Sequence, residues 1–236
     1  MRFVAVKSAE RQGVLVLHRT RDLLMRQRTM ILNAIRGHMA EFGVIAAQGP
    51  RKVMDLIQKL RRDEELGLPE IASAALHTLA AQLEAMTGEI RAIERRLMAW
   101  HRADATSQRL KSVPGVGIIT ATALSASVPD PSVFRSGRQF AAFLGLVPRQ
   151  NSSGGKDRLG RISKMGDGYL RKLLVVGATS VIRRAKRNDT AAGVWVRSLL
   201  ERKPARVATV AMANKTARIA WAVMARGETY RTQATA

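Results

Sequence analysis

The stretch LHTLAAQLEAMTGEIRAIERRLMAW, residues 76–100, places apolar side chains at alternating intervals of three and four. The stripe consists of Leu76, Leu79, Leu83, Met86, Ile90, Ile93, Leu97 and Trp100. This spacing puts them on one side of an α-helix and is the heptad pattern of a coiled coil. At 1.5 Å per residue the stripe is about 37 Å long, too long for a small domain to cover well. It predicts pairing with a second copy of the chain, which we favour, or with the preceding helix of the same chain.

Two helical patterns precede this stretch. Residues 8–42 predict a long helix that Gly43 ends, and residues 53–62 predict a shorter one. Arg21 and Arg28 fall on the apolar face of the first. We expect their charged ends to extend to the edge of that face. The alternative is that they meet phosphates or the carboxylates of another domain.

A glycine-containing turn follows the stripe. Residues 112–124 contain Pro114, Gly115, Val116 and Gly117, a pattern that resembles a helix-hairpin-helix. Gly115 and Gly117 would let N–H groups at a helix start approach a DNA phosphate. The alternative is an ordinary connection between two helices.

Three more helices are predicted after this turn, at residues 134–146, 169–187 and 204–226. The last is rich in alanine, which allows close packing, and Gly227 ends it. Lys215 and Arg218 form a polar patch on it that could face nucleic acid.

The most basic stretch of the chain is RQNSSGGKDRLGRISKMGDGYLRK, residues 149–172. It carries seven Lys and Arg against two Asp, with five glycines. Glycine lets the backbone approach an anion closely, and the cations add charge-assisted bonds to phosphate oxygens. The predicted nucleic-acid ligands here are Arg149, Lys156, Arg158, Arg161, Lys164, Arg171 and Lys172.

Two serines, Ser152 and Ser153, lie just before the paired glycines of this stretch. A serine hydroxyl beside a phosphate can donate a hydrogen bond, or it can attack phosphorus if it is activated. No histidine is near in sequence, although Lys156, Arg158 and Arg161 could stabilise charge at the reacting phosphorus. From the residues alone, a basic loop that only clamps a nucleic-acid backbone is the favoured interpretation.

The charge balance indicates a polyanionic partner. The 236 residues contain 40 Lys and Arg against 18 Asp and Glu, a formal net charge of +22. Residues 111–236 carry +16 of it and residues 1–62 carry +9, whereas residues 63–110 carry −3. Nucleic acid is the first expectation, because binding it neutralises phosphates and releases counterions.

Composition also excludes several classes of protein. The absence of cysteine excludes disulfides and thiolate metal sites, and the four scattered histidines have no metal-ligand spacing. No apolar run approaches the length of a membrane span, and the start has no secretory pattern. We therefore expect a cytoplasmic protein without membrane partners.

Three segments carry a resemblance to a known family: SVPGVGIITATAL (112–124), FAAFLGLVPRQNSSGGKDRLGRISKMGDGYLRKLLVVGA (140–178) and ANKTARIAWAVMARGETY (213–230). Together they closely resemble the carboxy-terminal domain of the insertion-sequence one-hundred-ten (IS110) family of transposases. These are DEDD-and-serine recombinases guided by a bridge RNA. The resemblance implies that Ser153 is the nucleophile, with Ser152 as the alternative, and that the chain acts on DNA with a guide RNA.

The resemblance also implies what the first segment is. Residues 1–45 look like the end of the family's RuvC-like nuclease domain, whose four acidic metal ligands would lie upstream of the residue matching Met1. The chain is therefore expected to lack them, to bind no metal or other cofactor and to be inactive alone. Mg²⁺ is expected for the full-length family.

Together these observations predict a mainly α-helical protein. Its expected parts are a helical remnant of a RuvC-like domain (1–45), a coiled-coil linker (46–110) that forms a dimer or larger homo-oligomer, and an all-helical, serine-bearing transposase domain (111–236). The expected function is DNA transposition by cutting and rejoining strands through a phosphoserine link of 5′ or 3′ polarity. The alternative is a non-catalytic fragment that binds nucleic acid and dimerises.

Overall fold

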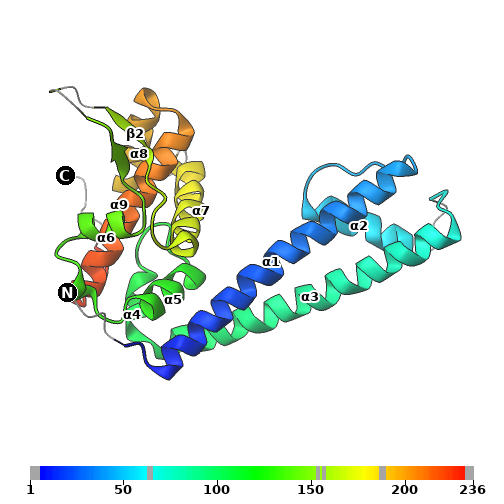
Figure 1. Cartoon of the computed structure of the whole chain (residues 1–236), viewed down its shortest axis with the longest axis horizontal. Coiled ribbons are helices and arrows are strands. Elements are labelled where there is room, and N and C mark those ends of the chain that lie inside the picture. The colour runs from blue at the N-terminus through cyan, green and yellow to red at the C-terminus, as the bar shows by residue number, and fades with distance from the viewer. Residues whose placement is uncertain (1–5, 63–65, 153–154, 156–157, 186–189, 232–236) are drawn as a thin grey trace. The chain divides into compact units, whose positions relative to one another are not determined.

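The computed structural model describes residues 6–62, 66–152, 155, 158–185 and 190–231. Over these ranges the chain forms nine α-helices, one short 3-10 helix and a single pair of short strands, which confirms the mainly α prediction (Figure 1). The chain divides into two compact units. The long-helix unit is Val16–Arg96, and the carboxy-terminal unit joins residues 97–236 to the first 15.

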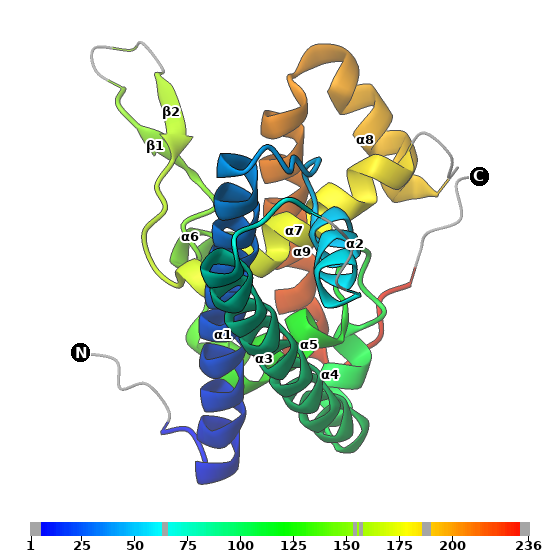
Figure 2. The ribbon, with the colours of Figure 1, turned by 90° about the vertical axis from the view of Figure 1, so that its right-hand side faces the viewer.

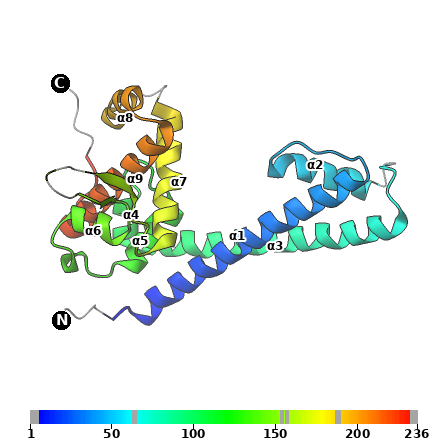
Figure 3. The ribbon, with the colours of Figure 1, turned by 45° about the horizontal axis from the view of Figure 1, so that its top comes forward.

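The long-helix unit contains most of α1 (Ala9–Glu41), all of α2 (Pro50–Arg61) and most of α3 (Glu70–Ala103). Within it α1 and α3 run antiparallel, and α2 lies over their connected ends (Figure 3). One apolar cluster joins the three helices: Leu32, Ile35, Met39, Val53, Leu56, Ile57, Leu60, Leu76, Ala80 and Leu83.

The heptad stripe is buried within a single chain. Leu76 and Leu83 lie in the three-helix cluster, and Ile90 and Ile93 are only 3% and 5% exposed. The intrachain interpretation therefore accounts for the pattern without a second copy. Homo-oligomer formation remains a prediction.

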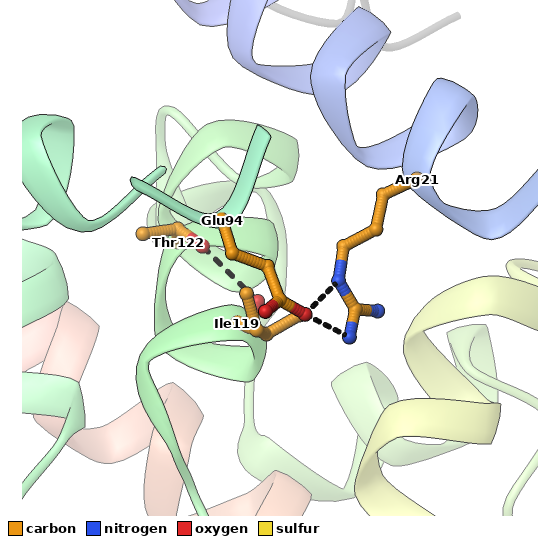
Figure 4. Close-up of polar contacts among 4 residues, drawn as sticks. All are labelled: Arg21, Glu94, Ile119 and Thr122. Atoms are coloured by element: carbon orange, nitrogen blue, oxygen red, sulfur yellow. Dashed lines mark hydrogen bonds and ion pairs between the residues drawn. The ribbon is translucent and has the colours of Figure 1, made fainter. Parts of the chain in front are cut away.

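Arg21 has a partner on the neighbouring helix. Its Nε and Nη2 donate hydrogen bonds of 2.8 and 2.6 Å to the same carboxylate oxygen of Glu94 on α3 (Figure 4). The guanidinium thus meets a carboxylate of its own chain, which neither sequence interpretation named. Figure 4 also shows the 3.1 Å bond from the Thr122 hydroxyl to the Ile119 carbonyl within the carboxy-terminal unit.

Ile90→Asp is expected to lower the free energy of unfolding by about 3 kcal/mol, because it places a charge where the chain buries an isoleucine. Ala85→Asp on an exposed position of the same helix is the matched control and should change it by less than about 1 kcal/mol. Chemical denaturation followed by circular dichroism measures both. A folded Ile90→Asp variant of unchanged stability that is smaller by light scattering would instead assign the stripe to an interface between copies.

After the last residues of α3, the carboxy-terminal unit continues with α4 (Ala105–Leu110), α5 (Ile118–Ser127), the 3-10 helix Pro131–Val133 and α6 (Gly137–Phe143). Strands β1 (Pro148–Gln150) and β2 (Leu159–Ile162) follow. The last three helices are α7 (Gly168–Ala185), α8 (Ala191–Arg202) and α9 (Ala205–Arg226). The sequence did not predict α8 or the strands.

Helix α9 is the centre of this unit and packs against α4, α6, α7 and α8. Its buried face is made mostly of small residues, including Ala208, Ala213, Ala217 and Ala220. Small side chains let neighbouring backbones come close, and Gly137 at the start of α6 would place a Cβ 3.0 Å from the Arg218 carbonyl oxygen. The alanine-rich sequence of α9 therefore determines how tightly the unit packs.

The predicted turn of Pro114–Gly117 does connect two helices, α4 and α5. Gly115 has a positive φ of 83°, and its carbonyl oxygen touches Gly177 of α7, where no Cβ could fit. Gly117 is the exposed N-cap of α5 and has no side-chain cap. Gly115 thus allows close packing of the turn against α7. Binding of a phosphate at the start of α5, where Gly117 lies, remains a prediction.

In the part of the chain that the structure describes, no helix combines the length and apolar character that crossing a membrane would require.

Candidate nucleic-acid interface

The basic stretch after α6 folds into a β-hairpin. Strands β1 and β2 are antiparallel, with Pro148 opposite Ile162 and Gln150 opposite Leu159, and the register shifts between these two pairs. In Figure 2 the two strands stand away from the helices of their unit. The hairpin presents exposed Arg149, Arg158 and Arg161. Folding as a hairpin therefore gathers cations that the sequence spreads over more than ten residues.

Ser152 takes part in closing this hairpin. Its hydroxyl accepts a 3.2 Å hydrogen bond from the Arg158 backbone N–H, and the Asn151 N–H donates to the Arg158 carbonyl at 2.9 Å. Ser153 and Lys156 lie outside the described residues. The predicted nucleophile therefore belongs to the segment between two strands, next to a serine with a structural contact.

The base of the hairpin is fixed by close backbone contacts with α6. A Cβ on Gly145 or Gly166 would overlap the carbonyl oxygens of Met165 and Phe143 respectively, and both glycines have positive φ. Arg171 Nη1 donates to the carbonyl oxygens of Leu144 at 2.9 Å and Met165 at 3.2 Å. Arg171, predicted to bind nucleic acid, thus has a structural role in holding the hairpin.

A groove of about 1390 Å³ runs between the hairpin, the start of α6, Trp195 of α8 and the exposed side of α9. Much of its lining is apolar, as at Val207, Val210 and Ile219. Among the residues that the structure describes, six cations line it and no carboxylate does: Arg138, Arg161, Lys164, Arg206, Lys215 and Arg218. Such a concave basic surface raises the local concentration of polyanions.

Four of the predicted nucleic-acid ligands meet in this groove. Arg161 and Lys164 come from the hairpin side, and Lys215 and Arg218 come from α9. Lys164 has a positive φ of 55°, which is uncommon for a residue with a side chain, so the backbone is constrained where this lysine enters the groove.

The other predicted ligands lie elsewhere. Arg149 is exposed on β1 and donates to the Ser163 carbonyl at 3.3 Å, and Lys172 is exposed on α7. Arg158 is exposed near the hairpin tip, and Gly115 and Gly117 belong to the α4–α5 turn. The predicted set is therefore distributed over several faces of this unit.

Sequence reasoning missed Trp195, Arg138 and Arg206 as groove residues. Lys215 Nζ lies 4.2 Å from the centre of the Trp195 ring, a cation–π contact between α8 and α9. Burial, followed by the positive charge of Arg218, lowers the pKa of Lys215. The available sequence signal was a lone tryptophan among basic residues. This signal predicts a binding groove only when α8 is known to lie beside α9.

The two buried histidines have structural surroundings. Burial, aided by the charge of Arg21, lowers the pKa of His18 to about 4, so this ring is neutral near pH 7. His101 Nδ1 lies 2.7 Å from the Ser107 hydroxyl, and burial is the main cause that lowers its pKa. Within the described ranges no three His, Asp or Glu side chains come together as metal ligands.

Comparison with known proteins identifies relatives along nearly the whole chain. Residues 107–192 match the model of the transposases of the IS116/IS110/IS902 family. A probable family 20 transposase of Pseudomonas aeruginosa is 47% identical over 98% of this chain and 69% of its own length. The transposase of insertion sequence element IS1111A of Coxiella burnetii is 40% identical over 98% of this chain and 64% of its own length.

A putative transposase of Sinorhizobium fredii, y4pF/y4sB, is 43% identical over 98% of this chain. The chain spans 59% of that relative's length, so all three relatives are considerably longer than the 236 residues. The similarity includes the hairpin, the groove and the helices that hold them. The chain therefore belongs to the IS116/IS110/IS902 family of transposases.

Proposed function

We propose that this chain is the part of a DNA transposase that binds DNA and supplies the serine nucleophile for cutting and rejoining strands. The observation that carries the proposal is the similarity to transposases over 98% of the chain. The groove lies next to the serine-bearing hairpin, and its described residues include six cations and no carboxylate, which fits a DNA substrate.

In the proposed reaction the Ser153 oxygen attacks a DNA phosphorus and forms a new P–O ester bond. The bond from phosphorus to one deoxyribose oxygen breaks, and the proton lost by serine is balanced by protonation of that oxygen. Attack on the ester by the hydroxyl of another strand reverses these steps, which restores a phosphodiester and the free serine. No external energy source is needed because each step exchanges one phosphate ester for another.

The groups of this chain that assist the reaction are cationic. Arg158 and Arg161 both follow the segment that carries Ser153 and are exposed, so they can approach the charged oxygens around the phosphorus. Ser152 keeps the strands together through its bond from the Arg158 N–H. Ser152 is thus the better candidate for positioning and Ser153 for attack.

The family resemblance implies Mg²⁺, which would supply Lewis-acid stabilisation of the phosphate charge. The described residues do not fit such a site, since no cluster of three His, Asp or Glu occurs among them. We propose that the carboxylates for this ion come from the family's acidic nuclease domain and that a guide RNA pairs with the target. The 236-residue chain alone is then expected to form no covalent adduct.

A non-catalytic nucleic-acid-binding role is the second candidate, favoured by the same uncompensated groove charge. The covalent intermediate separates the two functions. Joined to the amino-terminal segment of a full-length relative, the chain should form a denaturant-stable protein–DNA adduct on an insertion-sequence end. A fusion that folds and binds this DNA without forming the adduct would favour the non-catalytic role.

Binding of the chain to duplex DNA is expected to fall roughly a thousandfold between about 50 and 200 mM salt, with little dependence on DNA sequence, because about six phosphate contacts release counterions. The six groove cations and the +16 of residues 111–236 motivate this value. Fluorescence anisotropy over a salt series measures it. Affinity that changes less than about tenfold would contradict a binding surface built on phosphate contacts.

A further inference from the structure

The floor of the groove contains an aromatic and cationic pair whose arrangement the proposed reaction does not require. Trp195 of α8 is half-buried, and the ammonium group of Lys215 lies 4.2 Å from its ring centre. A second half-buried tryptophan, Trp221, also lines the groove, and its ring N–H is satisfied by the Pro131 carbonyl at 3.1 Å. Both rings therefore contribute flat apolar surface to the groove. The ring N–H of Trp221 already has an acceptor and needs none from a ligand.

Among the described residues, the groove cations have no carboxylate partner. Three ion pairs are present among the described residues, Arg21–Glu94, Arg26–Asp22 and Arg61–Glu84, and all lie in the long-helix unit. In the same described ranges none of the six groove cations forms an ion pair. Lys215 is half-buried and the other five cations are exposed. Like charges gathered in one groove repel one another, so an anionic ligand would stabilise this arrangement.

The combination of apolar floor, tryptophan faces and cations selects among anions. A free phosphate would use the cations and leave the floor and rings without a partner. A DNA duplex offers phosphates, but its bases are stacked on one another and present only their edges. An unpaired strand supplies both phosphates for the cations and base faces for the aromatic rings.

We propose that this groove binds a stretch of unpaired DNA, with a base stacked on the Trp195 ring in place of the Lys215 ammonium, and with Lys215 and Arg218 contacting the phosphates of the strand. The inference rests on the proposed function, since it places the unpaired strand beside the hairpin where cutting occurs. The groove volume of about 1390 Å³ exceeds the usual range for one small-molecule ligand, which fits several nucleotides. DNA is chosen over RNA because the proposed function acts on DNA strands, and a single-stranded RNA of the same sequence is one arm of the test.

The test compares variants of the chain in binding a labelled single strand of about 12 nucleotides and a duplex of the same sequence. Trp195→Ala should weaken single-strand binding by roughly tenfold or more and duplex binding by no more than about twofold. Trp195→Phe should recover most of the loss because it keeps an aromatic face. Val194→Ala, at the exposed neighbouring position of α8, is the matched control and should have no effect.

Thermal melting by circular dichroism shows whether the variants are folded. If Trp195→Ala does not fold, Lys215→Gln and Arg218→Gln decide, because each should reduce the slope of log affinity against log salt for the single strand by about one. Single-strand binding that Trp195→Ala leaves unchanged overturns the proposal. So does an equal loss on the duplex, or a larger loss on a single-stranded RNA of the same sequence.

These measurements need neither cutting nor metal, so they are independent of the proposed reaction. If the fused protein forms no serine adduct but its single-strand binding depends on Trp195, the proposed catalytic function is wrong and the groove assignment stands. If the adduct requires Ser153 but single-strand binding does not depend on Trp195, the catalytic function stands and the groove assignment is wrong.

Discussion

Ser153→Ala is expected to abolish the covalent protein–DNA adduct of the chain joined to the amino-terminal segment of a full-length relative, a loss of at least about a thousandfold. The reason is chemical, because alanine has no oxygen to form the ester with phosphorus. Denaturing gel electrophoresis of labelled DNA after quenching measures the adduct. Duplex binding should be unchanged, since the six groove cations remain.

Ser152→Ala is the matched control for this loss. It removes the hydroxyl that accepts the Arg158 N–H, so it should loosen the hairpin but leave most of the adduct. An adduct that survives Ser153→Ala and disappears with Ser152→Ala would reverse the assignment of the two serines. An adduct formed by the 236-residue chain unaided would contradict the need for another domain's carboxylates.

Gly177→Ala is expected to lower the free energy of unfolding by at least about 4 kcal/mol, because its new methyl group would overlap the Gly115 carbonyl oxygen. Within an exposed helix the same exchange normally stabilises a protein by about 1 kcal/mol. The sign of the effect therefore reports the contact between α7 and the α4–α5 turn. Thermal and chemical unfolding followed by circular dichroism measure it.

Gly88→Ala on α3 is the control for helix propensity. A Cβ there would have no neighbour within 4 Å, so this variant should be more stable by roughly 0.5–1 kcal/mol. If Gly177→Ala behaved like Gly88→Ala, the backbone contact between Gly115 and Gly177 would not exist in solution.

The sequence by itself determined the class of fold and predicted the chemical nature of the partner. Helical periodicity at residues 76–100 and 204–226 is a local property, since each side chain's direction follows from its place in the helix. The charge of +22 indicates a polyanion whatever the fold, because charge is a matter of composition. The hairpin was harder to predict from the sequence, since strand pairing between residues 148 and 162 depends on contacts across the loop.

The partner of the heptad stripe was decided only by the tertiary structure. The pattern of Leu83 and Ile90 is the same whether the facing helix belongs to the same chain or to another copy, because periodicity records which face is buried and not what covers it. The structure covers that face within the chain, and it gives Arg21 a carboxylate partner at Glu94.

The groove likewise depends on the packing of the helices. Lys215 and Trp195 are 20 positions apart in the sequence, and Arg161 is farther still from both. They line one surface because the small side chains of α9 let α6, α7 and α8 approach it closely, and because close glycine contacts fix the base of the hairpin. Residue identities thus determine the chemistry that is available, whereas the convergence of cations and aromatic rings in one place follows from long-range packing, which no local pattern encodes.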